Sequence, residues 1–259
     1  QGCQSCSRTN DGSRALHQSS IVTGVSGNTV TISPGLYSQF WSSSLSPQAS
    51  WFAKSNQVEW SGIENLKIIS NNSWESHLIS FTGAYASWVK NVEIQGVPPS
   101  NGRGIKVAWS NSISIVDSYI HDASEVGSAV YALELSWYTS NSLVQNNMMR
   151  NVPNGIAIIS TSGNVVSYNY GTVFPYTQVD WMPETLMTHG GHADYNLMEG
   201  NVYPTHYFDN IHGSGGNNVI FRSKLSGWES GKTGSTKPIS IEQRNNNYSI
   251  IGNVLGTSG

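Results

Sequence analysis

The sequence predicts an all-β fold, a right-handed parallel β-helix of about eight coils, from three observations. First, a short segment with the pattern apolar–x–polar–Asn–apolar recurs from residue 63 to residue 255. Second, the steps between equivalent positions vary from 22 to 32 residues, so strands of fixed register alternate with loops of variable length. Third, the segments are short, rich in β-branched residues and bounded by Gly, Asn and Ser, which is typical of strands. The equivalent positions are Asn65, Asn91, Asp117, Asn146, Tyr168, Gly200, Arg222 and Gly252.

The elements follow in chain order. Residues 1–57 form an N-terminal segment, in which residues 21–32 predict a β-hairpin that turns at Gly27 and Asn28. Residues 58–259 form the parallel β-helix. A second strand is expected in each coil, and two stacked ladders of strands therefore describe the solenoid. These second strands are expected at 77–81, 105–109, 131–135, 156–160, 185–189, 209–213 and 239–243.

Asparagine residues hold the same place in successive repeats. Asn147, Asn169, Asn201 and Asn253 are predicted to point inward at one turn and to form a ladder that Ser223 breaks. Such side chains satisfy backbone groups that a bend leaves unpaired. Most asparagines of this chain are therefore interpreted as structural.

Composition excludes two classes of partner. The net charge is −3, which gives no electrostatic footprint for nucleic acid. No run of 18 apolar residues exists, so no membrane span is expected. Cys3 and Cys6 are expected to form a local disulfide or a thiol pair, with redox or zinc chemistry as the alternative.

The chain begins with Gln1, shows no signal peptide and ends at Gly259 directly after a repeat strand. Solenoids need a capping element at each end. We therefore expect a piece of a longer protein, or ends that are covered by end-to-end self-association with another copy.

Alternation within the second strands predicts the outward side chains. Along one sheet face it places Lys106, Glu134, His189, His212 and Glu242 outward, with the last three on consecutive coils. Consecutive coils lie about 5 Å apart, close enough for groups to share a proton or a metal ion. These five residues are the candidate catalytic groups.

The segment from 172 to 214 combines a long loop with four histidines. Long loops on a rigid scaffold tend to carry function. The pair His189 and His192 is a candidate ligand set for a divalent cation, although the metal and the cofactor stay unknown. Exposed loop aromatics are expected to stack against sugar rings. The candidate substrate-binding residues are Trp137, Tyr138, Tyr176 and Trp181.

The repeats of residues 58–259 resemble the right-handed parallel β-helix proteins of the pectate-lyase-like superfamily. The stretch from Val22 to Pro34 also resembles a hairpin of large secreted bacterial β-helix proteins of that kind, in which a further β-helix portion normally precedes it. The resemblance implies the fold and a secreted or extracellular protein. The superfamily includes polysaccharide lyases, glycoside hydrolases, esterases, tailspikes and adhesins, and no motif of this chain matches a lyase or hydrolase signature residue by residue.

Two functions follow as hypotheses. The first is a secreted lyase of an acidic polysaccharide, with His189 or His212 as the base, Lys106 as the charge stabiliser and Glu242 as the orienting group. Hydrolysis is disfavoured because the outward strand face carries His and Lys but only scattered carboxylates, and hydrolysis needs two or three of them around the sugar bond. The alternative is a non-catalytic extracellular β-helix, such as an adhesin, a tailspike segment or a self-associating fibre subunit.

Overall fold

The structure, a computed structural model, describes residues 16–39, 41–71, 76–127 and 129–257. The predicted arrangement of Cys3 and Cys6 lies outside these residues. The described chain is all-β, with two short 3-10 turns, η1 (Ser43–Leu45) and η2 (Lys54–Asn56). No helix in the described ranges is long and apolar enough to cross a membrane.

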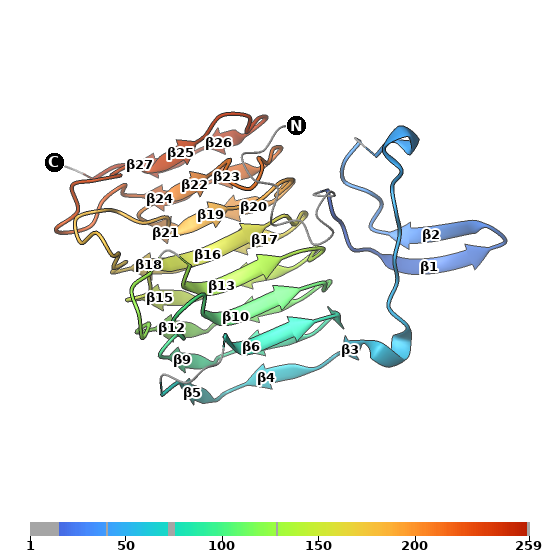
Figure 1. Cartoon of the computed structure of the whole chain (residues 1–259), viewed down its shortest axis with the longest axis horizontal. Helices are drawn as coiled ribbons and strands as arrows, with labels where there is room; N and C mark the ends of the chain where they lie inside the picture. Colours follow the sequence, from blue (N-terminus) through green and yellow to red (C-terminus); the bar gives the residue numbers. More distant parts are fainter. Residues whose placement is uncertain (1–15, 40, 72–75, 128, 258–259) are drawn as a thin grey trace.

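A parallel β-helix makes up most of the molecule, and its coils stack from β4 and β5 at one end to β26 and β27 at the other (Figure 1). Three parallel sheets run along it. Sheet 1 contains β6 (His77–Thr82), β10 (Arg103–Ala108), β13 (Tyr131–Ser136), β16 (Asn154–Ile159), β19 (Leu186–Thr188), β22 (His206–Phe208) and β25 (Ile239–Ile241). Sheet 2 contains β4 (Gly62–Glu64), β8 (Trp88–Lys90), β11 (Ser114–Val116), β14 (Leu143–Gln145), β17 (Val165–Ser167), β20 (Leu197–Glu199), β23 (Val219–Phe221) and β26 (Ser249–Ile251).

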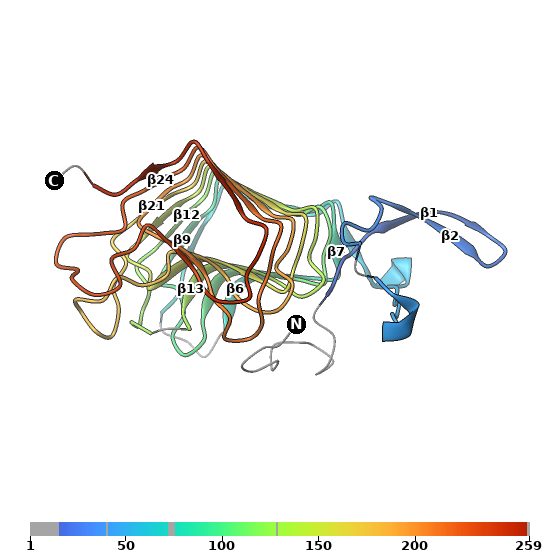
Figure 2. The ribbon, with the colours of Figure 1, turned by 90° about the horizontal axis from the view of Figure 1, so that it is seen from above.

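Sheet 3 follows sheet 2 in every coil after one sharp bend. It contains β5 (Lys67–Ile69), β9 (Glu93–Gln95), β12 (Tyr119–His121), β15 (Met148–Arg150), β18 (Tyr170–Thr172), β21 (Val202–Tyr203), β24 (Lys224–Leu225) and β27 (Val254–Leu255). A short pair, β3 (Val58–Glu59) and β7 (Ala84–Tyr85), precedes sheet 2. Seen from above, the three sheets enclose the core, and the hairpin of β1 (Ile21–Ser26) and β2 (Thr29–Ser33) projects from one side (Figure 2).

The predicted fold class and the N-terminal hairpin are confirmed, with two corrections. The solenoid has about seven turns rather than eight, because sheet 1 has seven strands while the other two sheets have eight. The prediction of two strand ladders is wrong, because each repeat segment bends in its middle and contributes one strand to sheet 2 and one to sheet 3.

The bend lies at the position by which the repeats align. All eight aligned residues, from Asn65 to Gly252, have left-handed backbone conformations with φ between 51° and 64°. Asn, Asp and Gly enter this region most easily, which explains why they hold six of these eight positions in the sequence. The sequence repeat therefore marks the corner between sheets 2 and 3, which occurs once in each coil.

Just after the corner, the inward asparagines form the predicted ladder. The backbone N–H of Asn147 donates to Oδ1 of Asn169 at 3.0 Å, and that of Asn169 donates to Oδ1 of Asn201 at 3.0 Å. Ser223 breaks only the contacts between side-chain amides, since its hydroxyl still accepts from the backbone N–H of Asn201 at 3.2 Å. Asn253 then accepts from the backbone N–H of Ser223 at 2.8 Å.

A second ladder, at the turn between sheets 1 and 2, was not predicted. The backbone N–H of Asn164 donates to Oδ1 of Asn196 at 3.1 Å, and that of Asn196 donates to Oδ1 of Asn218 at 2.8 Å. Each of these residues directly precedes a strand of sheet 2, a regularity that is present in the sequence. The two ladders clamp both ends of sheet 2.

We expect Asn169→Leu to lower the free energy of unfolding by about 1–3 kcal/mol, because the backbone N–H of Asn147 loses its acceptor inside the protein. Chemical denaturation of the variant measures the loss. Asn71→Leu, at an exposed position, is the matched control and should leave the stability unchanged. Equal stability of both variants would contradict a stabilising role for the ladder.

Candidate functional site

The last three strands of sheet 1 position a close group of titratable side chains. Thr188, Phe208 and Ile241 occupy one inward column of these strands. Alternation therefore turns the residue after each of them outward, and these residues are His189, Asp209 and Glu242. Strand spacing puts each about 4.8 Å from the next along the solenoid.

His189 is held between a carboxylate and a second histidine. Its Nδ1 contacts Oδ2 of Asp209, and the two side chains are almost fully buried. The other carboxylate oxygen of Asp209 accepts the backbone N–H of Ile211 at 3.1 Å. The ring of His212 meets the His189 ring edge-on, with centroids 4.7 Å apart. Because Nδ1 faces Asp209, Nε2 is the nitrogen of His189 that can act on a ligand.

Tyr207 and Glu242 form a second pair beside the first. The Tyr207 hydroxyl donates to Oε1 of Glu242, and the other carboxylate oxygen accepts the backbone N–H of Asn210 at 3.2 Å. Burial raises the pKa of Tyr207 well above its usual value, and the hydrogen bond to Glu242 raises it further. Tyr207 is therefore held as a neutral hydroxyl that carries a proton.

Glu184 completes the group from the end of the long loop. Burial raises the pKa of its carboxyl group, and the charges of Asp209 and Glu242 add to the increase. A carboxyl group in such surroundings holds its proton at a higher pH than a solvated one. We call Glu184, His189, Tyr207, Asp209, His212 and Glu242 the acid–base cluster.

The structure brings together three of the five residues that were proposed as catalytic, His189, His212 and Glu242. For His212, however, the predicted strand position was wrong. The strand expected at 209–213 lies at His206–Phe208, so Asp209 occupies the coil position given to His212, and Ile211 is 42% exposed rather than inward. His212 reaches His189 from the turn that follows the strand.

The structure separates Lys106 and Glu134 from the cluster. They lie on β10 and β13, two to three strands before β19, or about 10–14 Å away along the axis. Glu134 points outward but is buried, with one oxygen 2.5 Å from Nε of Arg103 and the other 3.8 Å from Nζ of Lys106. Burial alone would raise the pKa of Glu134, yet these two cations hold it below its usual value. Lys106 therefore lies too far from His189 to stabilise charge on the same sugar.

The outer face between these two regions is apolar and buried. Tyr131, Ala157, Ile159 and Met187 form a small hydrophobic cluster on it, and Tyr207 packs against its edge. The sequence predicted outward titratable side chains along this face, from Lys106 to Glu242. In the described structure the apolar part is covered, and the acid–base cluster lies at its C-terminal side.

The four aromatic residues proposed for sugar binding have different surroundings. The ring of Trp137 lies 4.8 Å from Nζ of Lys106, and Tyr138 is stacked between His17 and Trp109. Both therefore pack within the protein, away from the cluster. Tyr176 and Trp181 belong to the long loop that ends at Glu184.

The long loop is tied down by a second loop. Both carboxylate oxygens of Glu229 accept backbone N–H groups, from Val173 at 2.6 Å and from Phe174 at 2.8 Å. Nζ of Lys232 donates to the carbonyl of Val179 at 3.1 Å. These contacts fix the wall of the cluster that carries Glu184.

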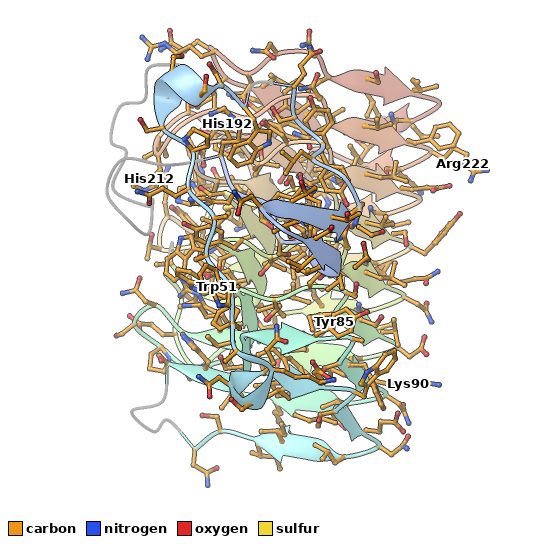
Figure 3. The ribbon with its side chains drawn as sticks, turned by 90° about the vertical axis from the view of Figure 1, so that its right-hand side faces the viewer. Trp51, Tyr85, Lys90, His192, His212 and Arg222 are labelled. Carbon is orange, nitrogen blue, oxygen red and sulfur yellow. The ribbon has the colours of Figure 1, made fainter. Side chains whose placement is uncertain are left out.

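The two histidines proposed as a metal pair face different carboxylates. His189 contacts Asp209, whereas Nδ1 of His192 lies 3.0 Å from Asp194. His192 and His212 both lie toward the C-terminal coils (Figure 3). Within the described ranges, no three His, Cys, Asp or Glu side chains are arranged to hold a metal ion.

Glu184, Tyr207 and Asp209 were not predicted as site residues. Asp209 and Tyr207 could have been found by placing the strand three residues earlier, where His206–Phe208 alternates inward and outward. Glu184 gives no periodic signal, because it comes from a loop. No family model and no curated protein sequence matches this chain.

Proposed function

We propose that this protein cleaves an acidic polysaccharide by β-elimination at the acid–base cluster. The observation that carries the proposal is the pairing of His189 with Asp209 beside the paired Tyr207 and Glu242. A base and a proton donor on neighbouring strands match the two proton transfers that elimination needs.

In this reaction Nε2 of His189 takes the proton from the sugar carbon next to the uronate carboxylate. The electron pair of that C–H bond forms a carbon–carbon double bond, and the bond from the adjacent carbon to the glycosidic oxygen breaks. The Tyr207 hydroxyl gives its proton to the leaving oxygen, and Glu242 orients the hydroxyl. Asp209 keeps the proton of His189 on Nδ1 and stabilises the imidazolium that forms.

Glu184 has a role in this proposal because the site is rich in carboxylates. A protonated Glu184 donates a hydrogen bond to the uronate carboxylate and adds no negative charge. The raised pKa of Glu184 supports this role. Glu184 therefore replaces Lys106 as the group proposed to stabilise the charge of the uronate.

Hydrolysis is the second candidate, and the structure favours it more than the sequence did. Three carboxyl groups that are scattered in the sequence, Glu184, Asp209 and Glu242, come together in one cluster. A protonated carboxyl group next to an ionised one can act as general acid and general base on a glycosidic bond. Elimination is preferred because it also uses the His189–Asp209 pair and Tyr207.

Polysaccharides of this kind are too large to enter cells, so we propose that the protein acts outside the cell. This agrees with the resemblance to secreted pectate-lyase-like β-helix proteins. If no cleavage is found, the alternative is a non-catalytic extracellular role, as an adhesin or fibre subunit.

The test is a panel of uronate polymers assayed for two products at once. Elimination creates a double bond conjugated to the carboxylate, which absorbs in the ultraviolet, together with new reducing ends. Hydrolysis gives reducing ends without the absorbance. If only reducing ends appear, the reaction is hydrolysis and not elimination. If folded protein gives neither product, both proposed reactions are contradicted.

A further inference from the structure

A second surface with binding character lies on a different sheet, near the opposite end of the solenoid. The outer face of sheet 2 has an open concavity of about 520 Å³ at β4, β8 and β11. The acid–base cluster lies at β19, β22 and β25 of sheet 1, so the two regions are well separated (Figure 1). The concavity is lined by Trp60, Glu64, Trp88, Lys90, Ser112 and Ser114, among others.

Trp88 lies against the backbone of the preceding strand. A Cβ atom added to Gly62 would come within 2.1 Å of the indole ring, so the absence of a side chain there makes room for it. The indole Nε1–H donates to Oε1 of Glu64 at 2.5 Å. The ring is thus fixed in place, and Glu64 is already engaged.

Trp60 adds a second indole to the same concavity. Its side chain is 67% exposed, which is unusual for so large an apolar group. Its backbone N–H donates to the carbonyl of Tyr85 at 3.2 Å, and its ring meets the Tyr85 ring edge-on at 5.8 Å. An exposed ring whose position is fixed loses little entropy when a ligand stacks on it.

Lys90 supplies a charge without a partner in the described part of the chain. It is exposed on β8, beside Trp88, and projects from the same side of the molecule as Tyr85 (Figure 3). No hydrogen bond or ion pair of its ammonium group occurs among the described residues. The concavity therefore combines two indole rings, three serine hydroxyls and one available cation.

We propose that this concavity binds a uronate residue of a polysaccharide chain without cleaving it. The sugar ring lies against Trp60 and Trp88, its carboxylate pairs with Nζ of Lys90, and Ser112 and Ser114 hydrogen-bond its hydroxyls. No histidine lines the concavity, so it lacks a counterpart of the proposed base; the site holds the polymer and the cluster cleaves it elsewhere.

The test measures binding of a uronate hexasaccharide by titration calorimetry in a His189→Ala background, where the proposed base is absent. We expect Trp60→Ala and Lys90→Ala each to weaken binding about tenfold, because stacking and charge pairing are each lost. Trp51→Ala and Lys224→Ala, which change an exposed tryptophan and an exposed lysine outside the concavity, are the matched controls and should bind normally. Unchanged melting temperatures establish that the variants are folded.

Three outcomes would overturn the proposal. The first is that Trp60→Ala and Lys90→Ala both bind the hexasaccharide as tightly as the background variant does. This is also the result expected if the hexasaccharide binds only at the acid–base cluster. The second is an equal loss in the Trp51→Ala and Lys224→Ala controls. The third is equal binding of a neutral hexasaccharide, which would remove the role of Lys90. Since no cleavage is measured, failure here is distinct from failure of the elimination reaction.

Discussion

His189→Ala is expected to lower the rate of polysaccharide cleavage by about 10²–10⁴-fold, the usual contribution of a general base. Nε2 of His189 accepts the proton in the proposed reaction, because Nδ1 contacts Asp209. The substitution removes that nitrogen and leaves Tyr207, Glu242 and Glu184 in place. The formation of unsaturated product, followed by its ultraviolet absorbance, measures the change.

His121→Ala is the matched control for this experiment. His121 is buried to the same extent as His189 and also contacts a carboxylate through Nδ1, that of Asp122 at 2.8 Å, but it lies on sheet 3. The control variant should keep its activity if it stays folded. Equal rates for the wild type and His189→Ala would exclude His189 as the base.

His206→Leu is expected to stabilise the protein, most strongly in acid. His206 points into the core between Leu186 and Ile239, is fully buried, and has no hydrogen-bond partner for either ring nitrogen among the described residues. Burial lowers the pKa of His206 to about 3. Leucine continues the apolar column and removes two unsatisfied polar atoms.

The pH dependence follows from the direction of the shift. The unfolded chain binds a proton on this histidine below about pH 6.5, and the folded protein does so only below about pH 3. The free energy of unfolding of the wild type therefore falls as the pH drops through this window, by about 2 kcal/mol between pH 6.5 and pH 5. In His206→Leu this contribution is absent.

Urea denaturation at pH 8 and pH 5 measures both effects. We expect His206→Leu to be more stable than the wild type at each pH, with the larger gain at pH 5. His192→Leu, which changes a partly exposed histidine, should not reduce the acid sensitivity in this way. An identical loss of stability on acidification in His206→Leu and the wild type would show that His206 is not its source.

The fold was largely predictable because Asn, Asp and Gly recur at one corner and Asn recurs just after it. The bend between sheets 2 and 3 requires a residue with a left-handed backbone conformation, such as Asn65. The ladder that follows the bend requires an inward hydrogen-bond acceptor, such as Asn169. Both requirements favour the same residue type at fixed positions, and the sequence therefore shows them as a repeat. The number of sheets was not predictable from alternation alone. A left-handed residue inside a segment reverses which side chains point inward, and the segment had been interpreted as one strand.

The candidate site was only partly predictable, since its residues come from strands and loops of different regularity. His189 and Glu242 follow inward residues of sheet 1, so alternation placed them correctly. His212 was placed on a strand that ends before it, because Ile211 suggested an inward position that the turn does not provide. Glu184 reaches the cluster through a loop that Glu229 anchors, and this contact spans 55 residues of sequence.

The most direct test of the proposed reaction is a crystal structure of the Tyr207→Phe variant with a uronate oligosaccharide. Loss of the hydroxyl removes the proton donor and leaves His189 and Asp209 in place, so uncleaved substrate should persist. We expect one uronate at the acid–base cluster, with the hydrogen on the carbon next to its carboxylate directed at Nε2 of His189 and the carboxylate against Glu184. An oligosaccharide bound with no uronate within reach of His189 would contradict elimination at this cluster.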